Sequence, residues 1–376
     1  METYRLSSRL KESNREYVIQ TFNDSQQNAV MTTVVVDGTP ADEMVSPHPA
    51  NILPEEVLSL VKITHAEKRQ ELELILQAYQ RSIEHDDISM MHQLGTVCLY
   101  KGLYKESTEI LARVTRVQPD HHQSHFALGQ AYLALGFLGE ALTSASRAIE
   151  LRPSFADYRN SLGDVFSASH NWAKAIKEYK EAIRINLYYA DAYLNLGIVI
   201  LRQAVHENPS GKDTTPATKA ADCIHKAGLI LADLRGRLFE EGLQQLEEGR
   251  WQDALESLTK LQKQRRDHHR QQSAGYYMKF ILHPEWISEE ALSDRIAYLQ
   301  AELKKNPQYV DLMADLGTCY CEQGRLLWQK GVEQYRRAVL INPSLSWLQH
   351  SLTIAQSAGQ HLHVDLRTQE RNSGKT

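Results

Sequence analysis

The sequence predicts a mainly α-helical protein, a solenoid of about seven helical hairpins that follows a small antiparallel β-meander. Two observations predict this fold. Leu-Gly pairs recur every 34 residues from Leu94-Gly95 to Leu196-Gly197, and a fixed period of this length is typical of stacked helical repeats. The first 50 residues lack this repeat and contain short segments rich in β-branched residues, which favour strands.

Residues 1–50 are predicted to form the β-meander. Four segments have the pattern of extended strands: Tyr4–Leu10, Glu16–Phe22, Val30–Val36 and Asp42–Val45. Asn23–Asn28 is predicted to be a polar connection, and Asp37-Gly38 is a hairpin turn signal. Because a sheet of this size is marginally stable alone, we expect it to pack on the helices or to pair across a homodimer.

Residues 51–87 are predicted to be a helical linker. Pro47, Pro49 and Pro54 interrupt regular structure. Apolar residues then follow helical spacing over 55–85. We expect these helices to cap the first repeat and to cover one face of the sheet.

Each repeat unit is predicted to be two helices that cross where their side chains are small. The positions that share this phase are Gly95, Gly129, Gly163 and Gly197, then Ala141 and Ala175, and the closing Pro119 and Pro153. A later unit contains Gly317 and Pro343, with two extra residues in a turn around Leu326–Gln329. One hairpin cannot bury its own apolar face, so neighbouring units stack.

The order of segments follows from this phase. Units 1–3 and the first helix of unit 4 cover 88–202, a loop insertion covers 203–217, and later, degenerate units cover 218–343. The sixth unit is predicted between Gly275 and Pro307. A capping helix over 344–360 and a polar tail over 361–376 complete the chain.

The repeated positions resemble the tetratricopeptide repeat (TPR) family, whose pattern is W-x2-L-G-x2-Y, then A-x3-F-x2-A, then P. The resemblance covers residues 88–343, although the Trp position holds Met91, His125, Arg159 and Tyr193. The strands before the repeats are similar to the layout of some uncharacterised bacterial TPR proteins. The resemblance implies a right-handed superhelix whose concave groove is lined by first helices and binds a protein or peptide. Carried onto this sequence, it implies these groove residues: His92, Thr96, Phe126, Gln130, Asn160, Asp164, Leu194 and Ile198.

Composition excludes several other classes of function. The formal net charge is −5, from 42 Lys and Arg against 47 Asp and Glu, so we expect no nucleic-acid partner. No apolar run approaches the roughly 20 residues that span a bilayer, and the N-terminus lacks the apolar core of a secretory signal. Four cysteines form no disulfide framework, which favours a cytoplasmic location.

Three short motifs were weighed for chemistry. Cys319-x-Cys321 lacks the CxxC spacing, and residues two apart on a helix point to different sides. His121-His122-x-x-His125 has no carboxylate nearby in sequence to complete a metal set. The basic stretch Lys260–Arg270 lacks interleaved aromatic residues, so we expect a solvated helix end. We expect no metal, no cofactor and no catalytic residue.

Three hypotheses remain open from the sequence. The leading one is a non-catalytic scaffold that binds a protein or peptide client in the concave groove. The alternative is a self-associating assembly protein that dimerises through residues 1–50, whose sheet edges can pair with a second copy. The third is an enzyme of unrecognised type in the β-meander.

Overall fold

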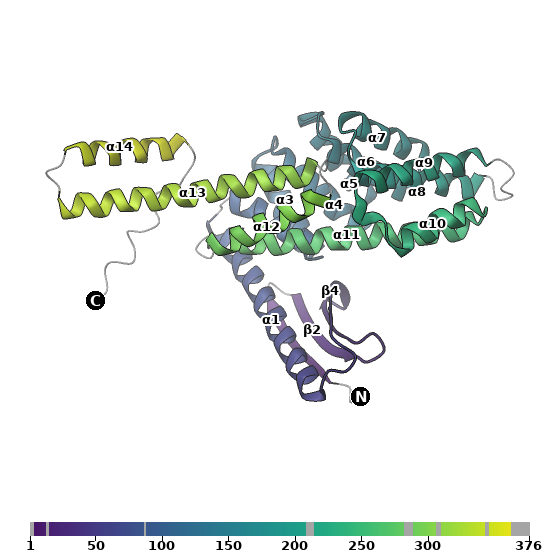
Figure 1. The fold of residues 1–376 in the computed structure, drawn as a ribbon, viewed down its shortest axis with the longest axis horizontal. Helices are drawn as coiled ribbons and strands as arrows, with labels where there is room; N and C mark the ends of the chain where they lie inside the picture. The colour runs from purple at the N-terminus through teal and green to yellow at the C-terminus, as the bar shows by residue number, and fades with distance from the viewer. Residues whose placement is uncertain are drawn as a thin grey trace. The chain divides into compact units, whose positions relative to one another are not determined.

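The computed structural model describes residues 4–12, 15–85, 88–207, 214–281, 289–305, 310–342 and 346–361 (Figure 1). Contacts divide the chain into two compact units, Met1–Trp286 and Ile287–Thr376. Three sequence-based predictions fall partly or wholly outside the described residues: Pro343, residues 208–213 of the 203–217 insertion and nearly all of the 361–376 tail.

The N-terminal segment forms the predicted antiparallel meander, with strand order β1-β2-β3-β4. The strands are β1 (Arg5–Glu12), β2 (Arg15–Asp24), β3 (Ala29–Val36) and β4 (Thr39–Pro47). Each strand is longer than predicted, and the polar connection shrinks to a turn over 25–28 because Asn23 and Asp24 pair with β3. Alternate residues of β2 and β3 are buried, so one face of the sheet contributes to the core.

A single helix, α1 (Pro54–His85), covers that buried face. The sequence analysis expected several helices here, but no Gly or Pro interrupts residues 55–85, so the helix continues for 32 residues. Near its start, Val57 and Val61 pack against Val30 of β3. Farther along, the core extends without a break from the sheet through α1 to the first hairpin.

Charged groups also join the sheet to the first hairpin. Glu106, which is buried in that hairpin, accepts hydrogen bonds from the Arg15 guanidinium and the Tyr17 hydroxyl, both at 2.7 Å. Burial raises the pKa of Tyr17, and its bond to Glu106 raises it further. Lys68 of α1 pairs with Asp42 of β4 and with Glu71. The sheet is therefore part of one compact unit with the hairpins.

Five helical hairpins follow in the first unit. Hairpin 1 is α2 (Ile88–Tyr100) with α3 (Tyr104–Val117), hairpin 2 is α4 (His122–Ala134) with α5 (Leu138–Leu151), hairpin 3 is α6 (Ala156–Ala168) with α7 (Trp172–Ile185), hairpin 4 is α8 (Ala190–Glu207) with α9 (Thr215–Ile230), and hairpin 5 is α10 (Arg237–Glu247) with α11 (Trp251–Ile281). A short 3-10 turn, Ala232–Leu234, precedes α10. The helices of each hairpin pack on each other and on the next hairpin.

Small residues at the predicted crossings permit this close packing. A Cβ added at Gly163 would lie 2.5 Å from the Tyr179 ring, and one at Gly129 would lie 3.2 Å from the backbone nitrogen of Ala145. Gly136 turns the chain between α4 and α5 with a φ of 80°, a conformation that favours glycine. His170 takes the same place in hairpin 3 with a φ of 57°.

The last two predicted units differ from the structure in their boundaries. Gly275 lies inside α11, so the sixth unit does not begin there. The second compact unit contains α12 (Glu289–Lys305), α13 (Val310–Ile341) and α14 (Ser346–His361). The predicted turn around 326–329 is wrong, since α13 is continuous, and a Cβ at Gly317 would meet nothing within 4 Å. In place of the last two predicted repeats there are two helix pairs that share α13, because α12 and α14 both pack on it.

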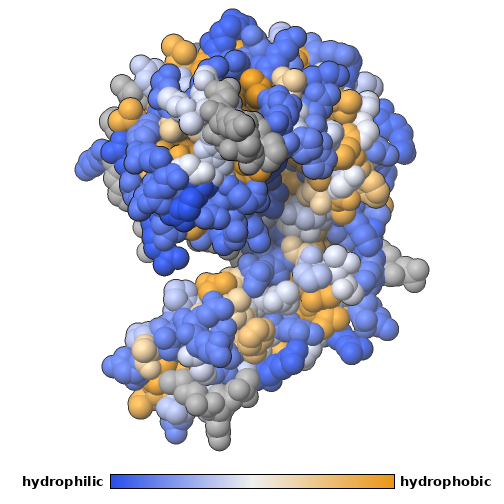
Figure 2. Space-filling model, turned by 90° about the vertical axis from the view of Figure 1, so that its right-hand side faces the viewer, coloured by the Kyte–Doolittle hydropathy of each residue, from blue (hydrophilic) through white to orange (hydrophobic). Residues whose placement is uncertain are grey.

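The face shown in Figure 2 is mainly hydrophilic, and its hydrophobic side chains gather in separate patches. Among the helices that the structure describes, none combines the length and the apolar character needed to cross a membrane.

Candidate functional site

The candidate site is the surface formed by the first helices of the hairpins. Helices α2, α4, α6 and α8 contact one another in that order, and we call them the inner layer. The long helix α11 packs against both α2 and α8. The protein's own chain therefore lies on the surface that the sequence predicts to bind a partner.

The length of α11 explains how it reaches this surface. The second helices α3, α5 and α7 each end after 14 residues, and Pro119 and Pro153 follow two of these ends. No Gly or Pro occurs between Trp251 and Ser273, so nothing stops α11 at the corresponding place. The prediction that Lys260–Arg270 is a helix end is wrong, because α11 continues to Ile281. The stretch is partly solvated, since Lys263 and Arg266 are exposed while Arg265 is only partly so.

A series of amide contacts joins α11 to the inner layer. The Gln262 side-chain amide donates to the Asn195 Oδ1 at 2.6 Å. The Asn195 amide nitrogen in turn donates to the Asn160 Oδ1 at 3.0 Å. Asn160 and Asn195 are both buried, and buried amides are costly unless they are hydrogen-bonded. These bonds therefore fix the three side chains relative to one another.

Arginines of α11 face two aspartates of the inner layer. The Arg265 Nε lies 3.2 Å from the Asp191 Oδ1, and both side chains are mostly but not fully buried. Asp164 accepts a hydrogen bond from the Tyr179 hydroxyl at 2.7 Å. Burial raises the pKa of Asp164, and the positive charge of Arg266 acts against that rise. The site thus has one ion pair between α8 and α11, and the charge of Arg266 acts on the Asp164 carboxyl of α6.

The contact continues to the first hairpin. An Arg270 guanidinium nitrogen donates to the Tyr104 hydroxyl at 2.8 Å, and its carbon lies 5.6 Å from the centre of the Tyr104 ring. This cation–π arrangement is favourable by about 1 kcal/mol at a partly exposed site. We call residues 262–270 the groove segment.

The eight groove residues named from the sequence have unequal access to solvent. Four are partly exposed: His92, Phe126, Gln130 and Asp164. The other four are buried: Thr96, Asn160, Leu194 and Ile198. Thr96 uses its hydroxyl to donate to the His92 carbonyl, so it is already satisfied within α2. Of the eight, Asn160 and Asp164 belong to the network that meets the groove segment.

Sequence reasoning missed Asp191, Gln262 and Arg265 as site residues and did not assign Asn195 to the groove. One signal for the α11 residues was available, namely a basic stretch in a helix without a stop signal. Its partners were not visible, because Gln262 and Asn195 are 67 residues apart and meet only once the intervening hairpins have stacked.

The histidines of the inner layer connect adjacent hairpins. The His92 Nδ1 lies 2.8 Å from the Ser124 hydroxyl, and the His92 ring centre lies 4.6 Å from that of His121. The His122 Nδ1 lies 2.6 Å from the Tyr158 hydroxyl. Burial, together with the nearby His121 and His122, lowers the pKa of His92 to about 4. Each imidazole therefore has a structural partner in the next hairpin or a neighbouring ring.

The described part of the chain contains no group of side chains arranged to hold a metal ion and no disulfide. No three His, Cys, Asp or Glu side chains among the described residues gather to hold a metal ion. Cys319 is buried and Cys321 is exposed, as expected for helix residues two apart. Cys98 is buried in the core around α1 and α2, and all four cysteines are free.

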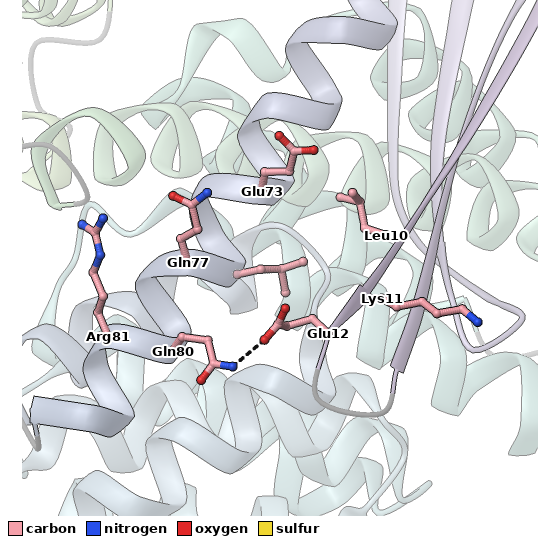
Figure 3. A pocket seen from close by; sticks show the side chains of 8 residues that line it. Leu10, Lys11, Glu12, Glu73, Gln77, Gln80 and Arg81 are labelled. Carbon is pink, nitrogen blue, oxygen red and sulfur yellow. Dashed lines mark hydrogen bonds between the residues drawn. The ribbon is translucent and has the colours of Figure 1, made fainter.

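A recess lies between the end of β1 and α1 (Figure 3). This recess has a volume of about 380 Å³ and mixes apolar and charged lining residues. Gln80 donates to Glu12 across it at 2.6 Å, while the Lys11 side chain points away. The recess brings together no nucleophile with a base, so it does not define a catalytic site.

Sequence profiles of known protein families match the region that forms the helical hairpins. Sequence profiles described as "tetratricopeptide repeat" and "TPR repeat" match residues 92–156 and 163–203. These ranges fall within hairpins 1 to 4. Residues 92–156 and 163–203 are therefore tetratricopeptide repeats. No curated protein matches the chain.

Solved structures resemble parts of the chain at low identity. A crystal structure of MamA is 21% identical, with 47% of this chain and 94% of MamA covered and a TM-score of 0.34. TTC0263, a TPR protein of Thermus thermophilus, is 15% identical, with 62% and 98% covered and a TM-score of 0.35. An O-GlcNAc transferase of Thermobaculum terrenum is 22% identical, with 42% of this chain and 26% of that enzyme covered and a TM-score of 0.30.

Proposed function

We propose that the protein is a non-catalytic scaffold that binds a protein or peptide client on its inner layer. One observation carries this proposal: a helical segment already lies there, held by Asn195 and Asp191 of α8, and Asn195 is in turn bonded to Asn160 of α6. The inner layer therefore has the shape and the polar groups that a bound helix needs.

The hairpins favour such binding because they are rigid before a client arrives. Crossings such as that of Gly163 with Tyr179 leave no free space, and the amides of Asn160 and Asn195 are held by each other. A receptor whose side chains are already ordered loses little conformational entropy when it binds.

Affinity capture from a lysate of the source cells tests the proposal. The full chain serves as bait beside two variants, Gln130→Lys on the inner layer and Thr143→Lys, which is exposed on the second helix α5. We expect a set of proteins that the wild type and Thr143→Lys retain and that Gln130→Lys loses. If all three baits retain the same proteins, the inner layer is not the client site.

A second candidate function, self-association through the sheet, is favoured by the face of the sheet opposite α1. Phe22, Met31 and Val45 are register partners across β2, β3 and β4, and Val18 pairs with Val35 on the same face, beyond the polar pair of Gln20 with Thr33. We call the five apolar residues the outer sheet face. Val45 is 48% exposed and the other four are partly exposed, and apolar groups exposed together favour association.

Light-scattering mass over a concentration series tests this second candidate. We expect a concentration-dependent dimer that Val45→Lys abolishes and that Ile63→Lys, at an equally exposed position on α1, leaves intact. A monomer at every concentration would contradict self-association through this face.

A further inference from the structure

We propose that the groove segment is a built-in competitor for the client, and that the client is a basic α-helix presenting the same groups as Gln262, Arg265 and Arg266. This inference rests on the proposed function of the inner layer. It adds the chemistry of the client and the way in which access to the site is limited.

The spacing of the three residues defines the surface that a client would present. Positions 262, 265 and 266 are i, i+3 and i+4, so they share one face of a helix. Gln262 donates to Asn195 and Arg265 pairs with Asp191, both on α8. Arg266 is exposed, and its positive charge acts on Asp164 of α6. A separate helix with an amide and two guanidinium groups at this spacing meets the same partners.

The charges of the inner layer select for a basic client. Asp191 is mostly buried beside Arg265, and burial already raises the pKa of Asp164. A neutral or acidic helix in place of α11 would leave these carboxylates without the positive groups that α11 supplies. An uncompensated buried charge costs several kcal/mol, so such helices are rejected.

The two halves of α11 are held by different kinds of contact, which makes the groove segment exchangeable. In the first half, Ala254 and Leu258 are fully buried, and Leu258 packs against Gly242 of α10. The groove segment makes polar contacts, among them the amide hydrogen bond of Gln262, the ion pair of Arg265 and the contact of Arg270 with Tyr104. Partly exposed ion pairs contribute about 1 kcal/mol or less each, so the segment can leave while the hairpin stays folded.

A peptide-binding experiment on the full chain tests the inference. The probe is a fluorescein-labelled peptide with the sequence of residues 258–273, and its anisotropy reports binding. The receptors are the wild type, the double variant Arg265→Glu with Arg266→Glu, and the control Lys263→Glu. Lys263 lies in the same helix turn and is exposed, so the control makes the same kind of charge change away from the inner layer.

We expect the double variant to bind the peptide at least tenfold more tightly than the wild type, and Lys263→Glu to bind like the wild type. Adding Asp191→Asn to the double variant should remove most of the gain, and raising the salt concentration should weaken binding. Equal affinity of all receptors, or no binding by any of them while far-ultraviolet circular dichroism shows folded protein, would overturn the inference.

Two further results separate this inference from neighbouring possibilities. If the double variant becomes a dimer by light scattering, the occupant is the α11 of a second copy, and the inference of a client helix fails. If inner-layer clients are captured by the wild type but the 258–273 peptide does not compete with them, the proposed function stands and the assignment of a basic helix fails.

Discussion

The N-terminal sheet and the groove segment both pack against the hairpins, but they do so by different chemistry. The sheet shares one apolar core with α1 and α2. Its Arg15 and Tyr17 also donate hydrogen bonds to the buried Glu106 carboxylate. The groove segment contributes amide and arginine contacts that remain partly exposed. The hairpins thus contact the sheet mainly through apolar side chains and the groove segment through polar ones.

This difference separates structural contacts from exchangeable ones. Removing the sheet would expose apolar surface and leave Glu106 as an unpaired buried charge, which is costly. Removing the groove segment would expose groups that water can solvate. We therefore regard the sheet as a fixed part of the scaffold and the inner layer as the place where binding changes.

The largest expected effect comes from breaking the sheet contact at Glu106. Glu106→Ala leaves Arg15 and Tyr17 without their buried partner, and such a loss costs about 3–5 kcal/mol. Urea denaturation measures the free energy of unfolding. The matched control is Glu109→Ala, since Glu109 also pairs with Arg15 but is about half exposed; we expect a loss of less than about 1 kcal/mol. Equal losses in the two variants would contradict the distinction.

The contacts between hairpins can be compared with the sheet contact through the pH dependence of stability, because His92 joins two hairpins. The pKa of His92 is about 4 in the folded protein against an ordinary value near 6.5. Below pH 6.5 the unfolded chain binds a proton that the folded chain does not, so stability is complete above that pH and falls as the pH drops toward 4. The full effect of His92 is about 3 kcal/mol.

His92→Gln tests this pH effect, because glutamine keeps a polar side chain without titrating in this range. We expect the variant to lose stability less steeply than the wild type between pH 6.5 and 4 in urea denaturation. A residual slope is expected from His122 and His125, whose pKa values burial also lowers. Parallel pH profiles for the two proteins would show that His92 is not buried in its neutral form.

A smaller effect is expected from overpacking within the inner layer. Gly163→Ala would place a Cβ 2.5 Å from the Tyr179 ring, and overpacking of this kind costs about 1–3 kcal/mol. Gly139→Ala in α5 meets nothing within 4 Å, so the better helix propensity of alanine should raise stability slightly. The midpoint of thermal unfolding compares the two variants, and opposite shifts are expected.

The smallest effect on stability is expected at the groove segment. Arg265→Ala removes the ion pair with Asp191, and we expect the free energy of unfolding to change by less than about 1 kcal/mol. Lys263→Ala is the control and should change it even less. A loss of several kcal/mol for Arg265→Ala would mean that the groove segment is as structural as the sheet.

Much of the fold could be predicted because the decisive signals are local. The phase of Gly95, Gly129, Gly163 and Gly197 locates the crossings of hairpins 1 to 4, and the β-branched run before Asp37-Gly38 locates β3 and its turn. Long helices were harder to predict. Gly324 in α13 resembles the turn glycine of a repeat, yet α13 continues through it, and one glycine in a helix costs only about 1 kcal/mol.

The site was less predictable than the fold. Family position drew attention to Asn160 and Asp164, but no local signal shows what lies against them. That partner comes from α11, whose course depends on how four hairpins stack and on the absence of a stop signal after Trp251. Leu194 and Ile198 illustrate the same limit, because their position in the repeat is that of groove residues and their side chains are buried.

Hydrogen exchange of the full chain tests most directly whether the groove segment lies on the inner layer and is exchangeable. We expect the amides of residues 262–270 to exchange at least tenfold faster than those of 251–261, to be slower than in a free peptide, and to lose this protection in the Arg265→Glu, Arg266→Glu variant. Exchange of both halves of α11 at one common rate, or exchange of 262–270 at the rate of a free peptide in the wild type, would contradict this.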